Sequence, residues 1–401
     1  MSGNGQIFDG VRVLELGHAI AAPFAAGILG DFGAEIIKIE RPGAGDHMRG
    51  LGPRKDDQPL WWKCAARNKR SVTLDFTVPE GREVILDLVR SSDVLIENFR
   101  PGTLERFGLG WEELLEINPR LVMVRISGFG QDTSMARRPG FGRLADAMSG
   151  AATLTGDPQG APTHVGFSLA DTLTGLMGAY GAAIALFARE RTGEGDCVDV
   201  ALFEPLMRLI DWQVIVYDQL GIVPTRAGGA FPLPLEGVAA GVTQTSDGVW
   251  MSFSSATDTV LVRLIKLIFG EEAIEEPRFA DRDSRRRNVG SVQEAVATWI
   301  EQRTAAEVEE EFARADAVVC RILDMEGIWR DQTVRERDDI IEVEDEVLGP
   351  IAMHGIVPKM SRRPGRVKHS GPTLGSSTDD VLSELGRSES EISDLRAAGT
   401  I

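Results

Sequence analysis

Asp171 is the residue of this sequence whose type and position best fit a chemical role. It lies in the segment Gly166–Gly175, where a helix rich in small residues is expected to begin. A carboxylate in the first turn of a helix lies at the positive end of the aligned peptide dipoles, which favours its ionised form. An ionised carboxylate can attack a carbonyl carbon and form a covalent intermediate. We therefore expect Asp171 to be a charged nucleophile.

The same residue also fits a structural interpretation. Ser168 and Asp171 have the spacing of a capping box, in which the hydroxyl and the carboxylate bind the first free N–H groups of a helix. From spacing alone the capping role is the more common of the two. The pattern of the surrounding sequence must decide between them.

Positive charge in the first third of the chain suits an anionic ligand. Arg41 and Arg106 are the best candidates, because each is expected at the carboxyl end of a strand or in the loop beyond it. Open α/β sheets bind ligands at that edge. A guanidinium there can hold a phosphate through two parallel hydrogen bonds.

Several enzyme classes lack their motifs in this sequence. The five histidines form no pair at metal-ligand spacing, and neither a G-x-S-x-G elbow nor a P-loop is present, so we expect no metal site. Glu40 ends a strand as the acid of a dinucleotide fold does, but Gly17–Ala22 reads GHAIAA where the glycine fingerprint should stand. His18 in that turn is a candidate for binding or catalysis, or for a structural hydrogen bond.

Composition sets limits on partners and location. The 401-residue chain has a net charge of -18, which argues against binding to nucleic acid or an anionic membrane. We expect no uncharged apolar run near the roughly 20 residues that cross a bilayer, and no export signal, and so predict a cytoplasmic protein. Cys64, Cys197 and Cys320 are far apart and suggest no disulfide framework.

The elements that must position Asp171 read as an α/β fold. Apolar strand candidates alternate with helical stretches, a pattern that predicts a parallel sheet covered by helices. A long helix with closely spaced glycines and alanines follows at about Leu169–Arg189. The strand candidates are Val11–Leu16, Glu35–Glu40, Ser71–Phe76, Asp93–Phe99, Leu121–Ser127 and Cys197–Leu202.

Three parts are expected along the chain. Residues 1–224 would form most of a large Rossmann-like domain, 225–330 a smaller α+β domain, and 331–401 a return to the large domain. The small residues of the long helix have two open explanations, close helix packing or the approach of a ligand, and packing is the more common one.

Motifs over nearly the whole chain resemble the family III CoA-transferases, of which α-methylacyl-CoA racemase is a divergent branch. Several long motifs in the right order make this resemblance specific. They are Gly10–Leu16, Ala22-Pro23, Gly33–Gly43, Gly45-Asp46, Asn68–Asp75, Asp93–Gly102, Ile126–Gln131, Thr192–Gly195, Gly371–Gly375 and Asp379–Gly386.

The resemblance implies an activity and a set of site residues. Asp171 would attack an acyl-CoA thioester and carry CoA as an aspartyl thioester until an acceptor carboxylate displaces it. Coenzyme A or acyl-CoA would be a substrate, with no permanently bound cofactor. The CoA-binding positions would be His18, Ile20, Ala21, Arg41, Leu74, Asp75, Phe76, Thr77, Asn98, Phe99, Arg100 and Arg106.

The resemblance also implies a partner. Subunits of the family are linked like rings, so an intertwined homodimer is expected, with acyl-CoA and a carboxylic acid as its small-molecule partners. The active site would then lie between the large domain of one chain and the small domain of the other.

Departures from the family pattern bear on the substrate. An acidic residue often follows the aromatic in the loop at Pro139–Gly142, whereas Gly142 follows Phe141 here. Polar help for the acyl group would then come from Arg143 or be absent. The glycine-rich loop of the oxalate enzymes has no counterpart beyond Gly228-Gly229, so oxalate is not expected.

Two alternatives to transfer remain. A racemase or epimerase would abstract a proton, but the Gly-His-Asp segment of that branch is replaced by Gly140-Phe141-Gly142. A CoA-binding, non-catalytic subunit of a heteromer is the other alternative, and the presence of Asp171 argues against it.

Overall fold

The computed structural model describes residues 5–229 and 237–401. Contacts divide the chain into two compact units. The first consists of Met1–Ala151, Val165–Asp211 and Val334–Ile401, and the second of Ala152–His164 and Trp212–Thr333. The bounds predicted from the sequence for the smaller domain, 225–330, stay a prediction, and 230–236 of it lie outside the described residues.

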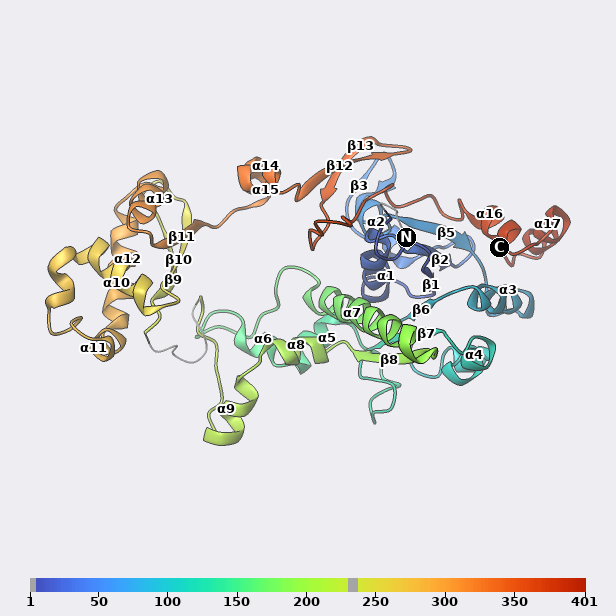
Figure 1. The fold of residues 1–401 in the computed structure, drawn as a ribbon, viewed down its shortest axis with the longest axis horizontal. Helices are drawn as coiled ribbons and strands as arrows, with labels where there is room; N and C mark the ends of the chain where they lie inside the picture. The colour runs from blue at the N-terminus through green and yellow to red at the C-terminus, as the bar shows by residue number, and fades with distance from the viewer. Residues whose placement is uncertain (1–4, 230–236) are drawn as a thin grey trace. The chain divides into compact units, whose positions relative to one another are not determined.

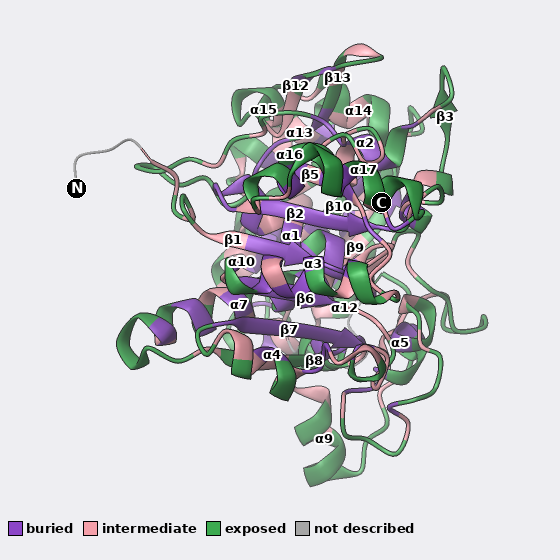
Figure 2. Ribbon diagram, turned by 90° about the vertical axis from the view of Figure 1, so that its right-hand side faces the viewer, coloured by how far each residue is buried: buried purple, intermediate pink, exposed green. Residues whose placement is uncertain are grey.

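A six-stranded parallel sheet forms the centre of the first unit (Figures 1 and 2). Its strands follow the order β5-β2-β1-β6-β7-β8, and every neighbouring pair is parallel. The predicted α/β class is confirmed. The strands are β1 (Arg12–Glu15), β2 (Glu35–Glu40), β5 (Lys69–Thr73), β6 (Val94–Glu97), β7 (Val122–Ser127) and β8 (Asp196–Ala201).

Helices cover both faces of this sheet because successive strand residues point to opposite sides. Val13 of β1 packs into the cluster under α1 (Ala21–Asp31) and α7 (Leu169–Thr192). Leu14 packs into the opposite cluster, which also takes residues from both ends of the chain. The helices on that second side are α3 (Pro79–Arg90), α4 (Trp111–Ile117), α16 (Thr378–Glu384) and α17 (Glu389–Ala397).

Shorter elements complete the first unit around the sheet. They include the antiparallel hairpin of β12 and β13 and several short helices and strands. These elements are η1 (His47–Gly50), β3 (Arg54–Lys55), β4 (Gln58–Pro59), α2 (Leu60–Ala65), η2 (Glu105–Phe107), α5 (Gly142–Met148), α8 (Glu204–Leu209), β12 (Ile340–Asp345) and β13 (Gly349–His354).

Glycines bring α7 close to its neighbours. A Cβ on Gly175 would lie 2.5 Å from the carbonyl oxygen of Ala21, and one on Gly181 would lie 2.6 Å from Cγ1 of Val198. Real Cβ atoms do not approach other atoms so closely, so these positions exclude a side chain. Close packing against α1 and β8 therefore accounts for these two glycines of the predicted helix.

One sequence expectation about α7 was wrong. The helix is long and apolar enough to cross a membrane by length and composition, whereas no such run was expected. Length and composition alone are weak evidence for a membrane span, and part of α7, including Ala179 and Ala182, is buried in the core of the first unit. Its contacts with α1 and the sheet explain why its inner face is apolar.

The second unit is an α+β arrangement with its own core. A three-stranded antiparallel sheet, in the order β11-β10-β9, packs against helices through Phe253, Leu264 and Phe312, all buried. Its strands are β9 (Ala240–Gln244), β10 (Trp250–Ser254) and β11 (Val318–Arg321). Its helices and the helices that connect it are α6 (Ala151–Leu154), α9 (Gln213–Leu220), α10 (Asp258–Phe269), η3 (Glu271–Glu275), α11 (Arg282–Arg287), α12 (Val289–Glu301), α13 (Ala305–Arg314), α14 (Met325–Arg330) and α15 (Gln332–Glu336).

The packing of α7 on α1 predicts that one added methyl group destabilises the first unit. In Gly175→Ala the new Cβ meets the backbone of α1, which cannot move aside cheaply, so we expect a loss of about 1–3 kcal/mol. Gly290→Ala in α12 is the control, because a Cβ there has nothing within 4 Å. It should gain up to about 1 kcal/mol of helix propensity. Urea unfolding followed by circular dichroism measures both, and equal midpoints would contradict the packing.

Candidate active site

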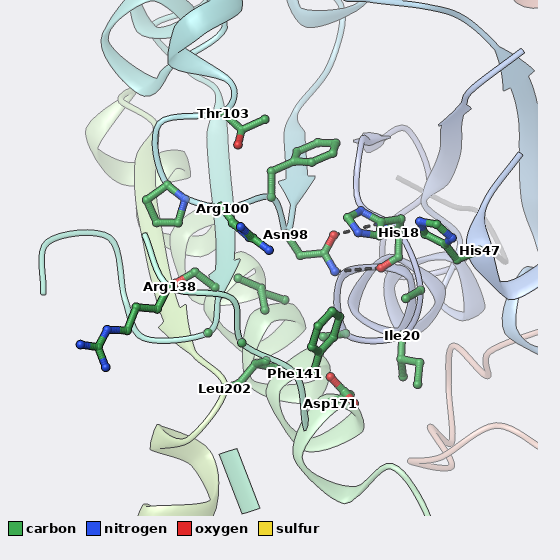
Figure 3. A pocket seen from close by; sticks show the side chains of 18 of the residues that line it. His18, Ile20, His47, Asn98, Arg100, Thr103, Arg138, Phe141, Asp171 and Leu202 are labelled. Atoms are coloured by element: carbon green, nitrogen blue, oxygen red, sulfur yellow. Dashed lines mark hydrogen bonds between the residues drawn. The ribbon is translucent and has the colours of Figure 1, made fainter. Parts of the chain in front are cut away.

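Two adjoining cavities open at the carboxyl edge of the parallel sheet. The first has a volume of about 710 Å³ and is lined by the segments that follow β1, β6 and β7 and by the start of α7 (Figure 3). The second has a volume of about 670 Å³ and is lined by the segments that follow β1, β2 and β5. His18, His47 and Phe99 line both. This edge is where open α/β sheets bind ligands.

The loop between β1 and α1 is fixed by side chains from two other loops. Asn98 accepts a hydrogen bond from the backbone N–H of His18 at 2.8 Å and donates one to the carbonyl oxygen of His18 at 2.8 Å. Asp46 accepts one from the N–H of Ala19 at 3.0 Å. Ala19 has a φ of 62°, which an alanine adopts only when its surroundings hold it there. The floor of both cavities is therefore preorganised.

A buried cluster of charges lies beneath this loop. The ammonium of Lys38 is 2.8 Å from Glu15, 2.7 Å from Asp46 and 2.9 Å from the carbonyl oxygen of Gly17. Lys69 binds the second oxygen of Glu15 at 2.8 Å. Burial alone would lower the pKa of Lys38, but the carboxylates around it raise the pKa above its usual value. The lysine stays charged and links β1, β2 and the loop.

Asp171 occupies the first turn of α7 and lines the first cavity. Figure 3 shows its side chain at one end of the cavity, close to Phe141 and Ile20. Ser168 is the N-cap residue, yet its side chain makes no capping hydrogen bond. Within the described residues the carboxylate of Asp171 accepts no hydrogen bond either, so the capping-box interpretation is wrong. The carboxylate is available to a ligand.

The charge state of Asp171 differs from the sequence expectation. Burial, together with the negative charge of Asp146, raises its pKa to about 6, whereas the helix start was expected to favour the charged form strongly. Desolvation and a like charge outweigh the helix dipole here. At pH 7, one unit above this pKa, about nine tenths of the side chains are still ionised. The residue is a carboxylate at neutral pH, and a more basic one than an exposed aspartate.

Gly142 makes room for this carboxylate. A Cβ at position 142 would lie 2.3 Å from Oδ2 of Asp171 and 3.0 Å from its Cγ. Any other residue at position 142 would force the carboxylate or the loop to move. In this chain Gly142 therefore lets the Asp171 side chain keep its observed conformation.

Sequence comparisons identify the family. Residues 8–378 match the family described as CoA-transferase family III. The chain belongs to this family. It is 38% identical to succinyl-CoA–D-citramalate CoA-transferase of Chloroflexus aurantiacus over 98% of both chains. It is 40% identical to the beta subunit of succinyl-CoA–L-malate CoA-transferase from the same organism, over 98% of this chain and 97% of that one.

Solved structures agree with this membership. A CAIB/BAIF family protein from Brucella suis superposes with a TM-score of 0.82 at 29% identity, covering 95% of this chain and all of that one. The family resemblance predicted from the motifs is confirmed, and the protein is an enzyme of the family III CoA-transferase group.

The structure brings most of the CoA-binding positions expected from the family to the two cavities. Arg106 is the exception, since it is absent from the described lining of both and its guanidinium lies 5.8 Å from the ring centre of Phe107. The first cavity is lined by Ile20, Ala21, Asn98 and Arg100, the second by Arg41, Leu74, Asp75, Phe76 and Thr77, and both by His18 and Phe99. Their roles toward CoA stay predictions.

Two residues with ionisable side chains in the described lining of these cavities were missed by the sequence analysis. His47 lies between the two cavities, with its ring 5.5 Å from that of His18, and Arg138 lines the first cavity. His47 directly follows the motif Gly45-Asp46. Its place next to that motif could have marked it as a candidate site residue. Burial lowers the pKa of His18, which favours a neutral imidazole facing this pair of cavities.

The pKa of Asp171, which Asp146 helps to raise, predicts where kcat/KM falls on the acidic side of its pH profile. The nucleophilic role expected for Asp171 requires its ionised form, so kcat/KM should fall as the pH falls through about 6. Asp146→Asn removes the like charge but leaves the burial, so the limb should move to lower pH without reaching the position of an exposed aspartate. The profile is measured with an acyl-CoA that the protein turns over. Asp394→Asn, at an exposed position of α17, is the control, and an unmoved limb in Asp146→Asn would contradict the coupling.

Proposed function

We propose that this enzyme moves CoA from an acyl-CoA to an acceptor carboxylic acid through covalent intermediates on Asp171. The observation that carries this proposal is the carboxylate of Asp171, which has no hydrogen-bond partner in the described chain and lies in the wall of a large cavity. A nucleophile must be both exposed to its substrate and not already bound. Asp171 meets both conditions.

CoA fits the two cavities by its chemistry. Its nucleotide part needs cationic groups for phosphate and an apolar surface for adenine, and the second cavity offers Arg41 and Phe76. Its thiol-ended arm would pass His18 and Phe99 into the first cavity and bring the thioester to Asp171. Arg100 and Arg106 are proposed as further contacts on the same side.

Each step of the reaction keeps its electrons and protons balanced. The Asp171 carboxylate attacks the thioester carbonyl, the C–S bond breaks and CoA leaves as a thiolate, which gives a mixed anhydride. The thiolate then attacks the aspartyl carbonyl and releases the donor acid, which leaves an aspartyl-CoA thioester. The acceptor carboxylate and the same thiolate repeat these two steps in reverse order, which restores the Asp171 carboxylate. A covalent intermediate divides the exchange into easier steps.

The intermediates carry an oxyanion that needs hydrogen-bond donors. The first N–H groups of a helix have no partner within the helix, and α7 begins two residues before Asp171. Donors held in place before the reaction stabilise developing charge without having to reorganise. We propose that the start of α7 takes this role.

The racemase alternative lacks a base. Gly140, Phe141 and Gly142 carry no ionisable side chain where that branch has Gly-His-Asp. The non-catalytic subunit alternative finds some support in two relatives, which are named alpha and beta subunits. Against it, this chain retains the unpaired carboxylate that the chemistry requires.

We also propose the intertwined homodimer. Large apolar side chains are exposed along the outer face of α7, at the three- and four-residue spacing of one helix side. They are Leu176, Tyr180, Ile184 and Phe187. A stripe of this kind fits a partner surface better than it fits water. A second copy of the chain is the partner that the family resemblance implies.

Removing the carboxylate of Asp171 should abolish transfer. Asp171→Asn keeps the size of the side chain but removes the nucleophile, so transfer should fall by at least about 1,000-fold while CoA affinity changes only a few-fold. With succinyl-CoA, intact-mass measurement should find a CoA adduct on the unmodified protein and none on the variant. Asp380→Asn, also in the first turn of a helix but exposed, is the control. Normal turnover of Asp171→Asn would refute the mechanism.

The purified chain should be a homodimer in solution. Light scattering of the purified chain should give twice the chain mass of 43.5 kDa. Ile184→Glu puts a charge in the apolar stripe and should weaken the dimer, because burying an unpaired charge is costly. Val347→Glu is the control, since that side chain is 53% exposed against 50% for Ile184 but belongs to a hairpin turn. A purified chain that stays monomeric would favour a heteromer instead.

A further inference from the structure

A third, smaller cavity lies beside Asp171. It has a volume of about 150 Å³ and is formed by the start of α5 and the segment leading into α7. Phe141 and Asp171 line both this cavity and the large one. The nucleophile therefore faces two spaces, and the proposed path of the CoA arm occupies only the larger.

Arg143 is the one cationic residue in the described lining of the small cavity. Its Nη1 donates a hydrogen bond to the carbonyl oxygen of Val165 at 2.8 Å and lies 3.7 Å from Oδ2 of Asp146. For Nε and Nη2 the described chain offers no hydrogen-bond partner. The first contact holds the side chain in place, while part of the guanidinium fork remains available to a ligand.

The charge of the cavity changes during the proposed reaction. In the free enzyme Asp146 and Asp171 contribute two negative charges against one positive charge on Arg143. Once Asp171 is acylated it is neutral, and the negative charge of Asp146 and the positive charge of Arg143 cancel. A second carboxylate, carried by the substrate itself, then meets Arg143 without the repulsion of an ionised nucleophile.

We propose that this cavity binds the distal carboxylate of a short dicarboxylic acyl group and that Arg143 is the residue that recognises it. This inference rests on the proposed function, because it places the reacting carbonyl at Asp171. Arg–carboxylate pairs combine charge with two-point geometry, which makes them specific for such a group.

The size of the cavity agrees with a chain of about four carbons. A cavity of about 150 Å³ holds one benzene molecule in a protein interior. The part of a succinyl group beyond its reacting carbonyl is smaller than benzene, and three C–C bonds of about 1.5 Å separate its two carboxyl carbons. Gly142 contributes to this room, since a Cβ there would meet Asp171.

The named relatives divide in the same sense. Relatives at 38% and 40% identity carry succinyl-CoA in their names, and a succinyl group has a distal carboxylate. Relatives at 36% and 32% identity are named for acetyl-CoA and formyl-CoA, whose acyl groups have none, and for oxalate, whose second carboxylate lies on the next carbon rather than at the end of a four-carbon chain.

The test compares two donors of equal chain length. Succinyl-CoA and butyryl-CoA differ in having a carboxylate or a methyl group at the far end. The rate of adduct formation on Asp171 is measured by rapid quench and intact mass, without any acceptor acid. Arg143→Gln should slow the reaction with succinyl-CoA by about 10- to 100-fold, the scale of a charge-assisted hydrogen bond, and leave that with butyryl-CoA within about threefold.

Two further variants make the result specific. Arg143→Lys keeps the positive charge and should recover part of the rate with succinyl-CoA. Arg90→Gln is the control, because Arg90 is 54% exposed against 55% for Arg143 and also pairs with an aspartate three residues away. It should change neither rate.

The outcomes separate this inference from the proposed function. Equal slowing with both donors, or no slowing with either, would overturn the role of Arg143 while the adduct itself still supports Asp171. The absence of an adduct from the unmodified protein with both donors would overturn the proposed function and this inference with it.

Discussion

The close approach of α7 to α1 is the constraint on which the site depends. Because Gly175 has no side chain, the helix that carries Asp171 lies against the carbonyl of Ala21, at the end of the loop that lines both cavities. One backbone contact thus helps to set the distance between the proposed nucleophile and the surface proposed for the CoA arm. Misplacing a catalytic group by about 1 Å can cost 100-fold in rate, so an exact contact at this point is worth the helix propensity that glycine loses.

A buried network of charges also holds the loop between β1 and α1 in place. Lys38 holds Glu15, Asp46 and the carbonyl of Gly17 together, and Asp46 in turn binds the backbone of the loop. Breaking such a buried network costs much more than forming it gains, because a charge would be left unpaired. The network is therefore better understood as a device that fixes one loop conformation than as a source of stability. Apolar residues of similar volume could not orient a backbone N–H.

Patterns within one element could be predicted from the sequence, and contacts between elements could not. Apolar runs placed the six parallel strands, and small residues marked α7 with Asp171 in its first turn. The raised pKa of Asp171 could not be predicted, because it depends on burial and on Asp146, 25 residues away in the sequence. The capping interpretation of Ser168 failed for a related reason: spacing permits that hydrogen bond, and only the observed side-chain conformation excludes it.

Family members often have an acidic residue where this chain has Gly142, whereas here the nearby negative charge is on Asp146. A side chain at position 142 would displace the end of the Asp171 side chain, whereas Asp146, one helical turn later in α5, raises the pKa of Asp171 through its negative charge. A carboxylate with a pKa of about 6 is a better nucleophile than one with an ordinary pKa, and at neutral pH most of it is still ionised. The same charge holds Arg143 nearby at 3.7 Å, too far for a tight pair. One aspartate therefore raises the basicity of Asp171 and stays too far from Arg143 for a tight ion pair, as the proposed binding of a substrate carboxylate requires.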